Sequence, residues 1–346
     1  MSLRFETFRE TPPEGWDDFV ADLDGTVFHS SHWAELQRQV QGTRPVFICA
    51  KDERGRPAGA ALGLYRQSRY PVLGRLLRGF ELPSHPVAGA PEPHVCEALV
   101  MESERIARRL GCARIRINSN FSGGSGLLQN VPDYVTTDRI EFEVDLSTDS
   151  EALWKAIKKD QRDRIRKLTQ ANVEYEWTAG AEATDALGAV RETALERRAE
   201  RNQGFTLPSD SGYYGKLFEA LIAPGAARLL LAKQGGAVIA AVLYATFARK
   251  AYSIFSGSNE AGYKLSAQSG LFWFAVTTFK EEGFRVLNRG GVPATAADEQ
   301  DPLHGIYRFK QRLGTKPVPC RSGEKVLSPI RDRIARLRRV VVGLGT

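Results

Sequence analysis

The sequence predicts an α/β protein (of the α+β kind) with two similar domains, each a mixed, mostly antiparallel sheet flanked by helices. The clearest observation is that the hydrophobic period changes twice within residues 228–291. Apolar runs separated by tight turns predict a three-stranded meander, a helical period follows, and a glycine stop precedes one more strand. These elements are expected at residues 229–232, 238–247, 251–255, 266–282 and 285–288.

The second observation is that the same order of signals occurs earlier in the chain. A hairpin pattern over 46–65 is followed by a helix over 95–110 that stops at Gly111, and then by a strand over 113–118. Such self-similarity indicates a duplication. We therefore divide the chain of 346 residues into a first domain, 1–138, and a second domain, 139–317, and expect 318–346 to pack back on the first.

The composition predicts an ordinary globular protein of the cytoplasm. Hydrophobic residues make up 42% and charged residues 26%, and the net charge is +7. No apolar run approaches the length of a membrane span, and charged residues interrupt the N-terminus where a signal peptide would need an apolar stretch. The four cysteines have no metal-binding spacing, so we expect neither a metal site nor a disulfide.

In the first domain a helix is expected after Ser30 or Ser31, either of which can cap it, with Trp33 on its inward face. His29 and His32 are three residues apart and could bring two imidazoles together. Since no third ligand is nearby, we interpret them as residues at a helix start. The arginine-rich segment 66–78 and the glycine-rich segment 122–126 are either binding loops or plain connections.

The second domain opens with an alternating strand at 139–146 and a helix capped by Ser150 that continues to residue 170. If this helix is continuous, four basic side chains recur on it at spacings of four, three and four and form one stripe: Lys155, Lys159, Arg162 and Arg166. The acidic residues Glu151, Asp160 and Asp163 are expected to lie off this stripe. It is therefore either a solvated face or a surface that binds RNA or another anion.

An ordered set of short motifs resembles the FemABX family of peptidoglycan bridge-forming aminoacyltransferases. The motifs are Phe28-His-Ser-Ser-His-Trp33, Arg162-Asp-Arg-Ile-Arg-Lys167, Arg201-Asn-Gln-Gly-Phe205 before Tyr213-Tyr214, Ala251-Tyr-Ser-Ile-Phe-Ser-Gly-Ser258, Arg289-Gly-Gly291 and Gly305-Ile-Tyr-Arg-Phe-Lys310. The resemblance implies two tandem GNAT-like (acyl-CoA N-acyltransferase-type) domains. The segment between 183 and 213 is too short for the helical hairpin of some members, so the chain resembles the hairpin-free subtype.

The resemblance also implies the reaction. Members transfer an amino acid from aminoacyl-tRNA to the amine of a nucleotide- or lipid-linked muropeptide, a peptidoglycan precursor, and need no cofactor. The ester is already activated, so the chemistry needs donors for the oxyanion and no protein nucleophile. Lys310 is the expected catalytic cation, and Phe309 is expected to stack on the terminal adenine of the tRNA or to pack in the core.

Further residues are expected to hold the acceptor. Arg38 stands beside Gln37, where relatives commonly have a phosphate-binding lysine, and Asn118-Ser119 replaces an acidic residue followed by proline. Arg201 suits bidentate binding of a carboxylate or phosphate, and the tyrosines suit orientation of the peptide. The expected acceptor-binding residues are Arg38, Arg201, Tyr213, Tyr214, Tyr252, Gly290 and Gly291.

Two other functions stay open. One is an N-acyltransferase that uses acetyl-CoA on a polysaccharide or small amine, although the segment 256–264 lacks the usual pyrophosphate loop. The other is a non-catalytic module that binds RNA or an anionic polymer through the basic stripe. Finally, Ser328 and Pro329 start a basic amphipathic helix over 328–341, which either lies on the inner face of the membrane or packs on the first domain.

Overall fold

The computed structural model describes residues 3–66, 78–89, 93–123, 126–180, 182–200 and 212–334. The chain forms two compact units. The first unit is Met1–Asp138 together with Cys320–Thr346, and the second unit is Arg139–Pro319. The domain boundaries expected from the sequence are after residue 138 and after residue 317.

The first unit contains a mostly antiparallel sheet with the strand order β1-β2-β3-β4-β6-β13, and β5 adds to β3. The pair β4 and β6 is parallel, with Gly79 opposite Arg114 and Leu82 opposite Ile117. The strands are β1 (Arg4–Arg9), β2 (Arg44–Lys51), β3 (Pro57–Arg66), β4 (Gly79–Leu82), β5 (Val87–Ala88), β6 (Arg114–Ile117) and, within this unit, residues 320–326 of β13 (Lys316–Val326).

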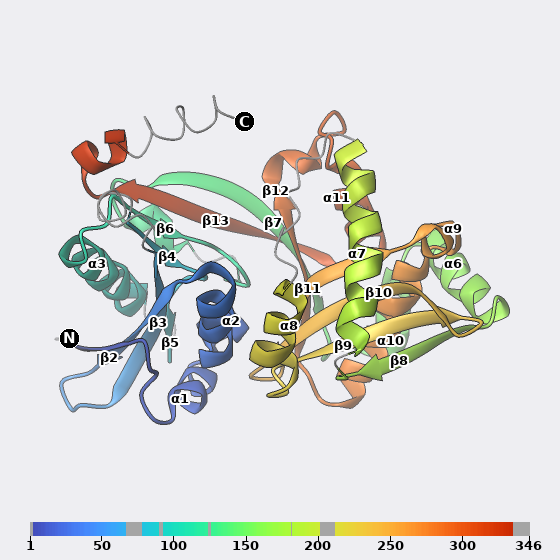
Figure 1. Cartoon of the computed structure of the whole chain (residues 1–346), viewed down its shortest axis with the longest axis horizontal. Coiled ribbons are helices and arrows are strands. Elements are labelled where there is room, and N and C mark those ends of the chain that lie inside the picture. The colour runs from blue at the N-terminus through green and yellow to red at the C-terminus, as the bar shows by residue number, and fades with distance from the viewer. Residues whose placement is uncertain are drawn as a thin grey trace. The chain divides into compact units, whose positions relative to one another are not determined.

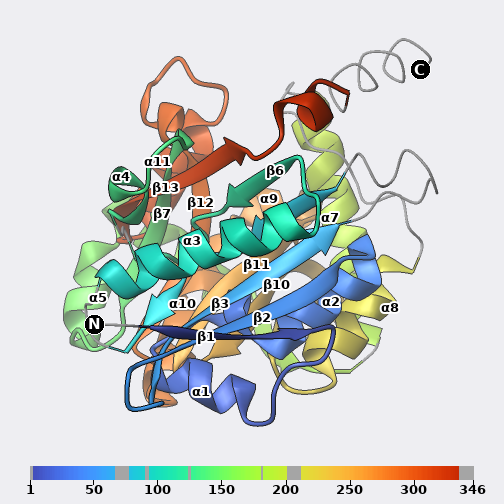
Figure 2. The same cartoon turned by 90° about the vertical axis from the view of Figure 1, so that its left-hand side faces the viewer.

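Helices cover both faces of this sheet, and Figure 2 shows α3 lying across the strands. Successive residues of β2 point to opposite faces. Ile48 belongs to the core cluster that α3 completes, whereas the Phe47 ring lies 5.0 Å from that of Trp16 on α1. The helices are α1 (Trp16–Asp22), the 3-10 turn η1 (Val27–His29), α2 (Ser31–Gln41), α3 (Pro93–Arg109) and α4 (Leu127–Asn130).

The second unit contains a sheet with the order β7-β12-β11-β10-β9-β8. Adjacent strands of this sheet are antiparallel, except that β11 and β12 run parallel. A helix precedes the later strand of the parallel pair in both units, α3 before β6 and α10 before β12, as a duplication predicts. The strands are β7 (Val135–Asp145, from Arg139 in this unit), β8 (Val173–Thr178), β9 (Ala227–Gln234), β10 (Ala237–Phe247), β11 (Lys250–Ser258) and β12 (Val286–Pro293).

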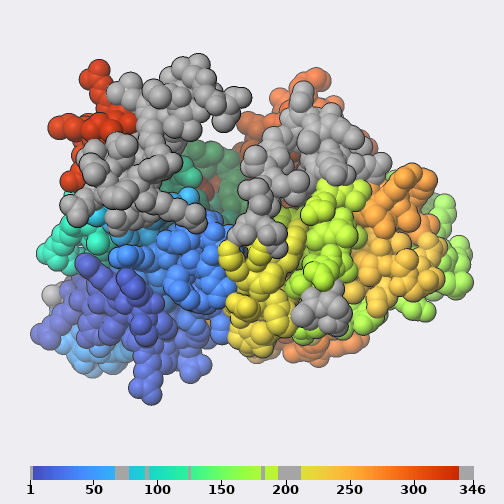
Figure 3. Space-filling model, in the orientation of Figure 1, coloured from blue at the N-terminus to red at the C-terminus, as the bar shows by residue number. Residues whose placement is uncertain are grey.

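Figure 1 shows α7 crossing in front of β9, β10 and β11 while α10 lies behind them. The main core lies on the α10 face, where fully buried Leu271 and Phe272 of α10 join Val242 and Tyr244 of β10. On the other face α7 and α8 lie side by side (Figure 3). The helices are α5 (Ser150–Ala156), α6 (Lys159–Gln170), α7 (Glu182–Glu200), α8 (Tyr213–Leu217), the π-helical η3 (Phe218–Ile222), α9 (Glu260–Leu265), α10 (Ala267–Glu281), the 3-10 turn η4 (Ala294–Ala297) and α11 (His304–Arg312).

The predicted fold class is confirmed, but three local expectations were wrong. The helix expected to run to residue 170 is two helices, because Ile157 is buried in an extended conformation between α5 and α6. Asp149 rather than Ser150 caps α5, since its carboxylate accepts the N–H groups of Glu151 and Ala152. The sequence also favours two short strands, around 317–320 and 324–327, but the structure has the single strand β13 there.

The C-terminal segment is described only in part. Residues 329–334 are helical, and Asp332 pairs with Arg114 of β6 within the first unit. Ile330 is 75% exposed. The remainder of the expected amphipathic helix lies outside the described residues. None of the helices in the described ranges is both long and apolar enough to cross a membrane.

Candidate active site

The two parallel strands of the second unit separate at a bulge. Pairing between β11 and β12 runs from Lys250 opposite Val286 to Tyr252 opposite Asn288, although both strands continue. The register of β12 against β7 also shifts between Asn288 and Gly291. Arg289 and Gly290 therefore lie at the bulge, where the backbone of β12 leaves its ladder.

Two glycines make this bulge possible. Gly290 has φ +68°, a left-handed conformation that side chains with a Cβ rarely adopt, and its N–H donates to Asn288 Oδ1 at 2.7 Å. A Cβ on Gly291 would lie 2.5 Å from Arg139 Nη2 and 2.8 Å from the Ile140 carbonyl oxygen. Any larger residue at 291 would displace β7 or the Arg139 side chain.

Lys310 of α11 reaches the bulge from the α10 face of the sheet. Its ammonium donates to the carbonyl oxygens of Arg289 at 2.8 Å and Gly290 at 2.9 Å, and lies 5.5 Å from the centre of the Phe142 ring. Two carbonyls and an aromatic face together fix the position of this cation. The charge is thus held where β11 and β12 diverge.

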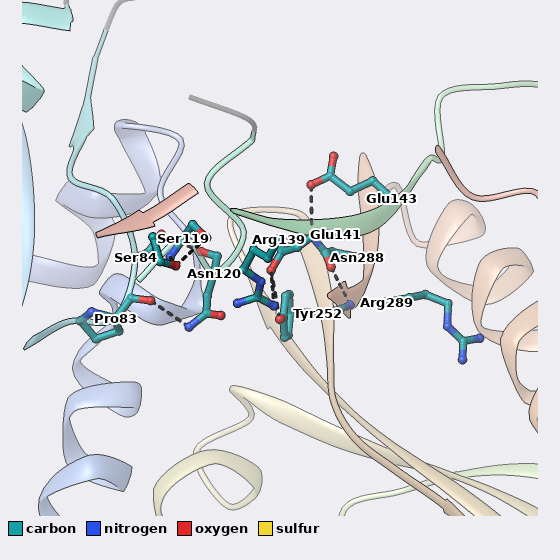
Figure 4. Close-up of polar contacts among 12 residues, drawn as sticks. Pro83, Ser84, Ser119, Asn120, Arg139, Glu141, Glu143, Tyr252, Asn288 and Arg289 are labelled. Atoms are coloured by element: carbon teal, nitrogen blue, oxygen red, sulfur yellow. Dashed lines mark hydrogen bonds and ion pairs between the residues drawn. The ribbon is translucent and has the colours of Figure 1, made fainter. Parts of the chain in front are cut away.

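The opposite face of the bulge carries a buried carboxylate, Glu141, whose contacts Figure 4 shows. Glu141 is fully buried. Its carboxylate accepts from Asn288 Nδ2 at 2.8 Å and from the Tyr252 hydroxyl at 3.4 Å, and Arg139 Nη2 lies 3.3 Å away. These partners offset the cost of burying its charge.

The environment shifts the proton affinities of two neighbours. Burial, with the negative charge of Glu141 as a second cause, raises the pKa of Tyr252 well above its ordinary value. Burial and the charge of Glu141 also raise the pKa of Glu143, against a hydrogen bond from Asn288. Tyr252 therefore remains a neutral phenol at physiological pH and can act as a hydrogen-bond donor or acceptor.

Five of the residues predicted from the sequence meet at this bulge: Lys310, Phe309, Tyr252, Gly290 and Gly291. Phe309 is partly buried against the core, and the Arg289 guanidinium lies 5.9 Å from its ring centre. The bulge combines a fixed cation on one face with a phenol and a buried carboxylate on the other. That arrangement suits stabilisation of an oxyanion and orientation of an amine.

The other predicted residues lie elsewhere. Tyr213 and Tyr214 are on α8, where Tyr213 is buried against Phe255 and Tyr214 packs against Gly188 of α7. Arg201 lies outside the described residues. Arg38, in the first unit, is bound to Glu35 through two hydrogen bonds, at 2.6 and 2.7 Å, on an exposed surface of α2.

In the first unit, polar groups gather after the parallel pair β4 and β6 (Figure 4). Ser84 Oγ donates to the Asn120 carbonyl oxygen at 2.6 Å, and Asn120 Nδ2 donates to the Pro83 carbonyl oxygen at 3.0 Å. Asn118 Nδ2 donates to Glu81 Oε1 at 2.6 Å. A carboxylate is thus present here on the neighbouring strand.

The expectation that acidic residues leave the basic stripe unneutralised was wrong. Lys155 is on α5 and pairs with Glu151 at 2.7 Å, while Arg166 pairs with Asp163 at 3.0 Å. Arg162 donates to the carbonyl oxygens of Lys155 and Ile157 and so caps the end of α5. Among the four, only Lys159 has neither an ion pair nor a side-chain hydrogen bond within the described ranges.

Three residues of the bulge were not predicted from the sequence: Glu141, Asn288 and Arg139. Glu141 occurs in an alternating strand where acidic residues normally face solvent, so its pattern is that of an ordinary surface position. Asn288 falls at the predicted end of a strand. The sequence feature that could have indicated Asn288 is its position directly before Arg289-Gly290-Gly291. A polar side chain there can accept a backbone N–H that a bulge leaves unpaired.

The chain resembles known proteins both in sequence, over part of its length, and in fold. Residues 155–311 match the family described as "Acetyltransferase (GNAT) domain". The structure of FemX superposes with a TM-score of 0.74 at 14% identity, covering 96% of this chain and 99% of FemX. No curated protein sequence matches the chain.

Two further structures share the fold. L-PGS from Bacillus licheniformis has a TM-score of 0.58 at 15% identity, and the match covers 91% of this chain and 92% of the L-PGS chain. A tandem GNAT protein from the clavulanic acid biosynthesis pathway has a TM-score of 0.51 at 12% identity, and the match covers 95% of this chain and 99% of that protein's chain. The fold of two tandem GNAT-like domains predicted from the sequence is confirmed, and FemX shares it.

Proposed function

We propose that this chain transfers an amino acid from aminoacyl-tRNA to the amine of a peptidoglycan precursor peptide, because it matches an acetyltransferase (GNAT) domain and shares the fold of FemX. The observation that carries the proposal is the position of Lys310. Its ammonium is held by two backbone carbonyls at the bulge of β12, directly after Phe309.

The reaction then runs without a protein nucleophile. The neutral amine of the acceptor attacks the ester carbonyl carbon of the donor, forming a C–N bond and a tetrahedral oxyanion. The ribose C–O bond breaks as the intermediate collapses, and the proton lost by the amine is transferred to the ribose oxygen. Lys310 stabilises the oxyanion, since a positive charge fixed beforehand costs no reorganisation in the transition state.

The other face of the bulge orients the acceptor. Tyr252 bonds to the buried Glu141, which fixes its hydroxyl and leaves the phenol as a polar contact for the attacking amine. Phe309 provides a ring for the terminal adenine of the tRNA, and stacking on a ring tolerates any base. Lys159 supplies a charge for the tRNA backbone.

A second candidate donor is acetyl-CoA, which the match to an acetyltransferase domain family favours. In the second unit, β11 is followed by α9, and the Asn259 side chain caps this helix by accepting the N–H of Gly262 at 3.0 Å. This cap occupies one of the backbone donors that a pyrophosphate would need at the start of the helix. The aminoacyl-tRNA donor is therefore preferred.

One assay separates the donors. The full-length protein is incubated with either radiolabelled aminoacyl-tRNA or radiolabelled acetyl-CoA, together with a nucleotide-linked muropeptide or, separately, phosphatidylglycerol vesicles. The acceptors are then analysed by mass spectrometry. The proposal predicts addition of an amino acid residue from the tRNA pool. Acetylation from acetyl-CoA without any aminoacyl transfer would overturn it, and transfer to phosphatidylglycerol vesicles instead of muropeptide would reassign the acceptor.

A further inference from the structure

Arg289 is a buried arginine that the proposed transfer does not use. Its side chain is only 7% exposed and points away from Glu141 and Asn288, as Figure 4 shows. The guanidinium carbon lies 4.8 Å from the centre of the Phe272 ring and 5.9 Å from that of Phe309. Nε and Nη1 have no hydrogen-bond partner among the described residues.

A second unpaired polar group lies on the same face of the sheet. Tyr244 of β10 is fully buried, and its hydroxyl has no hydrogen-bond partner within the described part of the chain. Tyr244 lies opposite Ser253 of β11, and the preceding residue of that strand, Tyr252, lies opposite Asn288, which directly precedes Arg289. Burial raises the pKa of Tyr244 to about 12, and the positive charge of Arg289 opposes this shift. Rings of Trp177 and Phe279 surround the phenol.

The chemistry of these groups selects the kind of ligand. The guanidinium has only donors, the phenol can donate as well, and no carboxylate within the described ranges forms an ion pair with Arg289. Contact with aromatic faces stabilises a cation but does not satisfy its N–H groups. A buried, unpaired charge is costly to the fold, so its natural partner is an anion that arrives from outside.

We propose that Arg289 and Tyr244 form a receptor for a small oxyanion. The Nε and Nη1 groups point to different sides of the guanidinium, and each can donate an N–H to an oxygen of a carboxylate or phosphate. The assignment of this oxyanion to the acyl donor rests on the proposed function. It is then either a carboxylate on the acyl group or a phosphate of the donor, next to the Lys310 that acts on the ester.

Binding can be measured without any acyl donor. The melting temperature of the full-length protein is recorded against increasing acetate or inorganic phosphate, with chloride at the same ionic strength as reference. We expect the oxyanions to raise the melting temperature more than chloride does. A stronger effect of acetate indicates a carboxylate ligand, and a stronger effect of phosphate indicates the donor phosphate.

Two variants test the residues. Arg289→Met removes the unpaired charge, so the ligand-free protein should melt at a higher temperature and the oxyanion effect should vanish. Tyr244→Phe removes one donor and should weaken oxyanion binding by about tenfold with little change in ligand-free stability. Arg285→Met is the matched control, because Arg285 is exposed directly before the same strand and should leave the oxyanion effect unchanged.

The outcomes separate this proposal from the proposed function. If acetate and phosphate act no differently from chloride on the parent protein, or if Arg289→Met melts lower and keeps the oxyanion effect, Arg289 is a structural cation and the receptor is refuted. Neither result concerns transfer of an amino acid. Conversely, failure of the donor assay with intact oxyanion binding would refute the aminoacyl donor and leave the receptor standing.

Discussion

The Asn288 amide nitrogen lies 2.8 Å from Glu141 Oε2, and this bond joins β12 to β7 inside the second unit. The same nitrogen lies 3.1 Å from Glu143 Oε1, so one amide serves two carboxylates. Its carbonyl oxygen accepts the N–H of Gly290. Asn288 therefore couples the buried charge of Glu141 to the backbone of the bulge.

Asn288→Ala should lower the free energy of unfolding by about 2–3 kcal/mol, because fully buried Glu141 loses a hydrogen bond to its charge. Urea denaturation measures the change. The matched control is Asn130→Ala, which removes an exposed hydrogen bond of similar length, 2.9 Å, to Glu97 and should cost less than about 0.5 kcal/mol. Equal losses in both variants would contradict the role given to Asn288.

Gly291→Ala should destabilise the protein by about 1–3 kcal/mol, since its methyl group overlaps the Ile140 carbonyl oxygen and Arg139 Nη2. Gly305→Ala is the control, because Gly305 lies in α11 with nothing within 4 Å of a Cβ. That substitution should be neutral or stabilise by up to about 1 kcal/mol. Thermal or urea unfolding compares the two, and a harmless Gly291→Ala would show that the backbone here is not tightly packed.

Glu143 should make stability depend on pH. Its pKa is raised in the folded protein, so its neutral form is favoured, and stability is lost as the pH rises through that raised pKa. Glu143→Gln stays neutral and keeps an acceptor for Asn288. Its unfolding free energy should exceed that of the parent at neutral pH and converge with it below about pH 4.

Asp145→Asn provides a control of opposite sign. Hydrogen bonds from Ser147 hold the pKa of Asp145 below its ordinary value, so its contribution is present at neutral pH and lost as the pH falls. Asp145→Asn should therefore be less stable than the parent at neutral pH, with the difference shrinking in acid. A pH-independent difference for Glu143→Gln would count against a raised pKa.

Lys159 should contribute to RNA binding. It is exposed at the start of α6 and has no ionic partner within the described ranges, unlike Lys155 and Arg166. Lys159→Ala should weaken tRNA affinity and reduce the slope of log affinity against log salt by about 1. The control is Lys264→Ala on α9, an exposed lysine already paired with Glu260. Identical slopes in parent and Lys159→Ala would exclude a phosphate contact.

The sequence predicted most elements of the fold because their signals are local. Gly235 and Gly236 both have positive φ in the turn between β9 and β10, as a tight hairpin requires. The helical period of α10 ends at Gly283, which also has positive φ. Arg289 lies in β12 and Lys310 lies in α11, the next α-helix along the chain. Their motifs were therefore visible in one short stretch of sequence.

The missed features depend on tertiary contacts. No residue near Ile157 is a helix breaker such as proline or glycine. The helix is interrupted because Ile157 is buried in the core and Arg162 caps the end of α5. Alternation in β7 shows that Glu141 and Phe142 face opposite ways, but both faces are covered in the structure. Which acidic residue is buried follows from Asn288 and Tyr252, which are more than a hundred residues away.

The measurement that most directly tests Lys310 as the catalytic cation is the single-turnover rate of aminoacyl transfer by Lys310→Ala. Loss of a positive charge that acts on the transition state should lower this rate by about a hundredfold or more, roughly 3 kcal/mol, with acceptor affinity nearly unchanged. Lys310→Arg should recover part of the rate. Arg308→Ala, an exposed residue of the same helix, should stay near the parent rate. Transfer by Lys310→Ala at close to the parent rate would contradict the assignment of the active site to the bulge of β12.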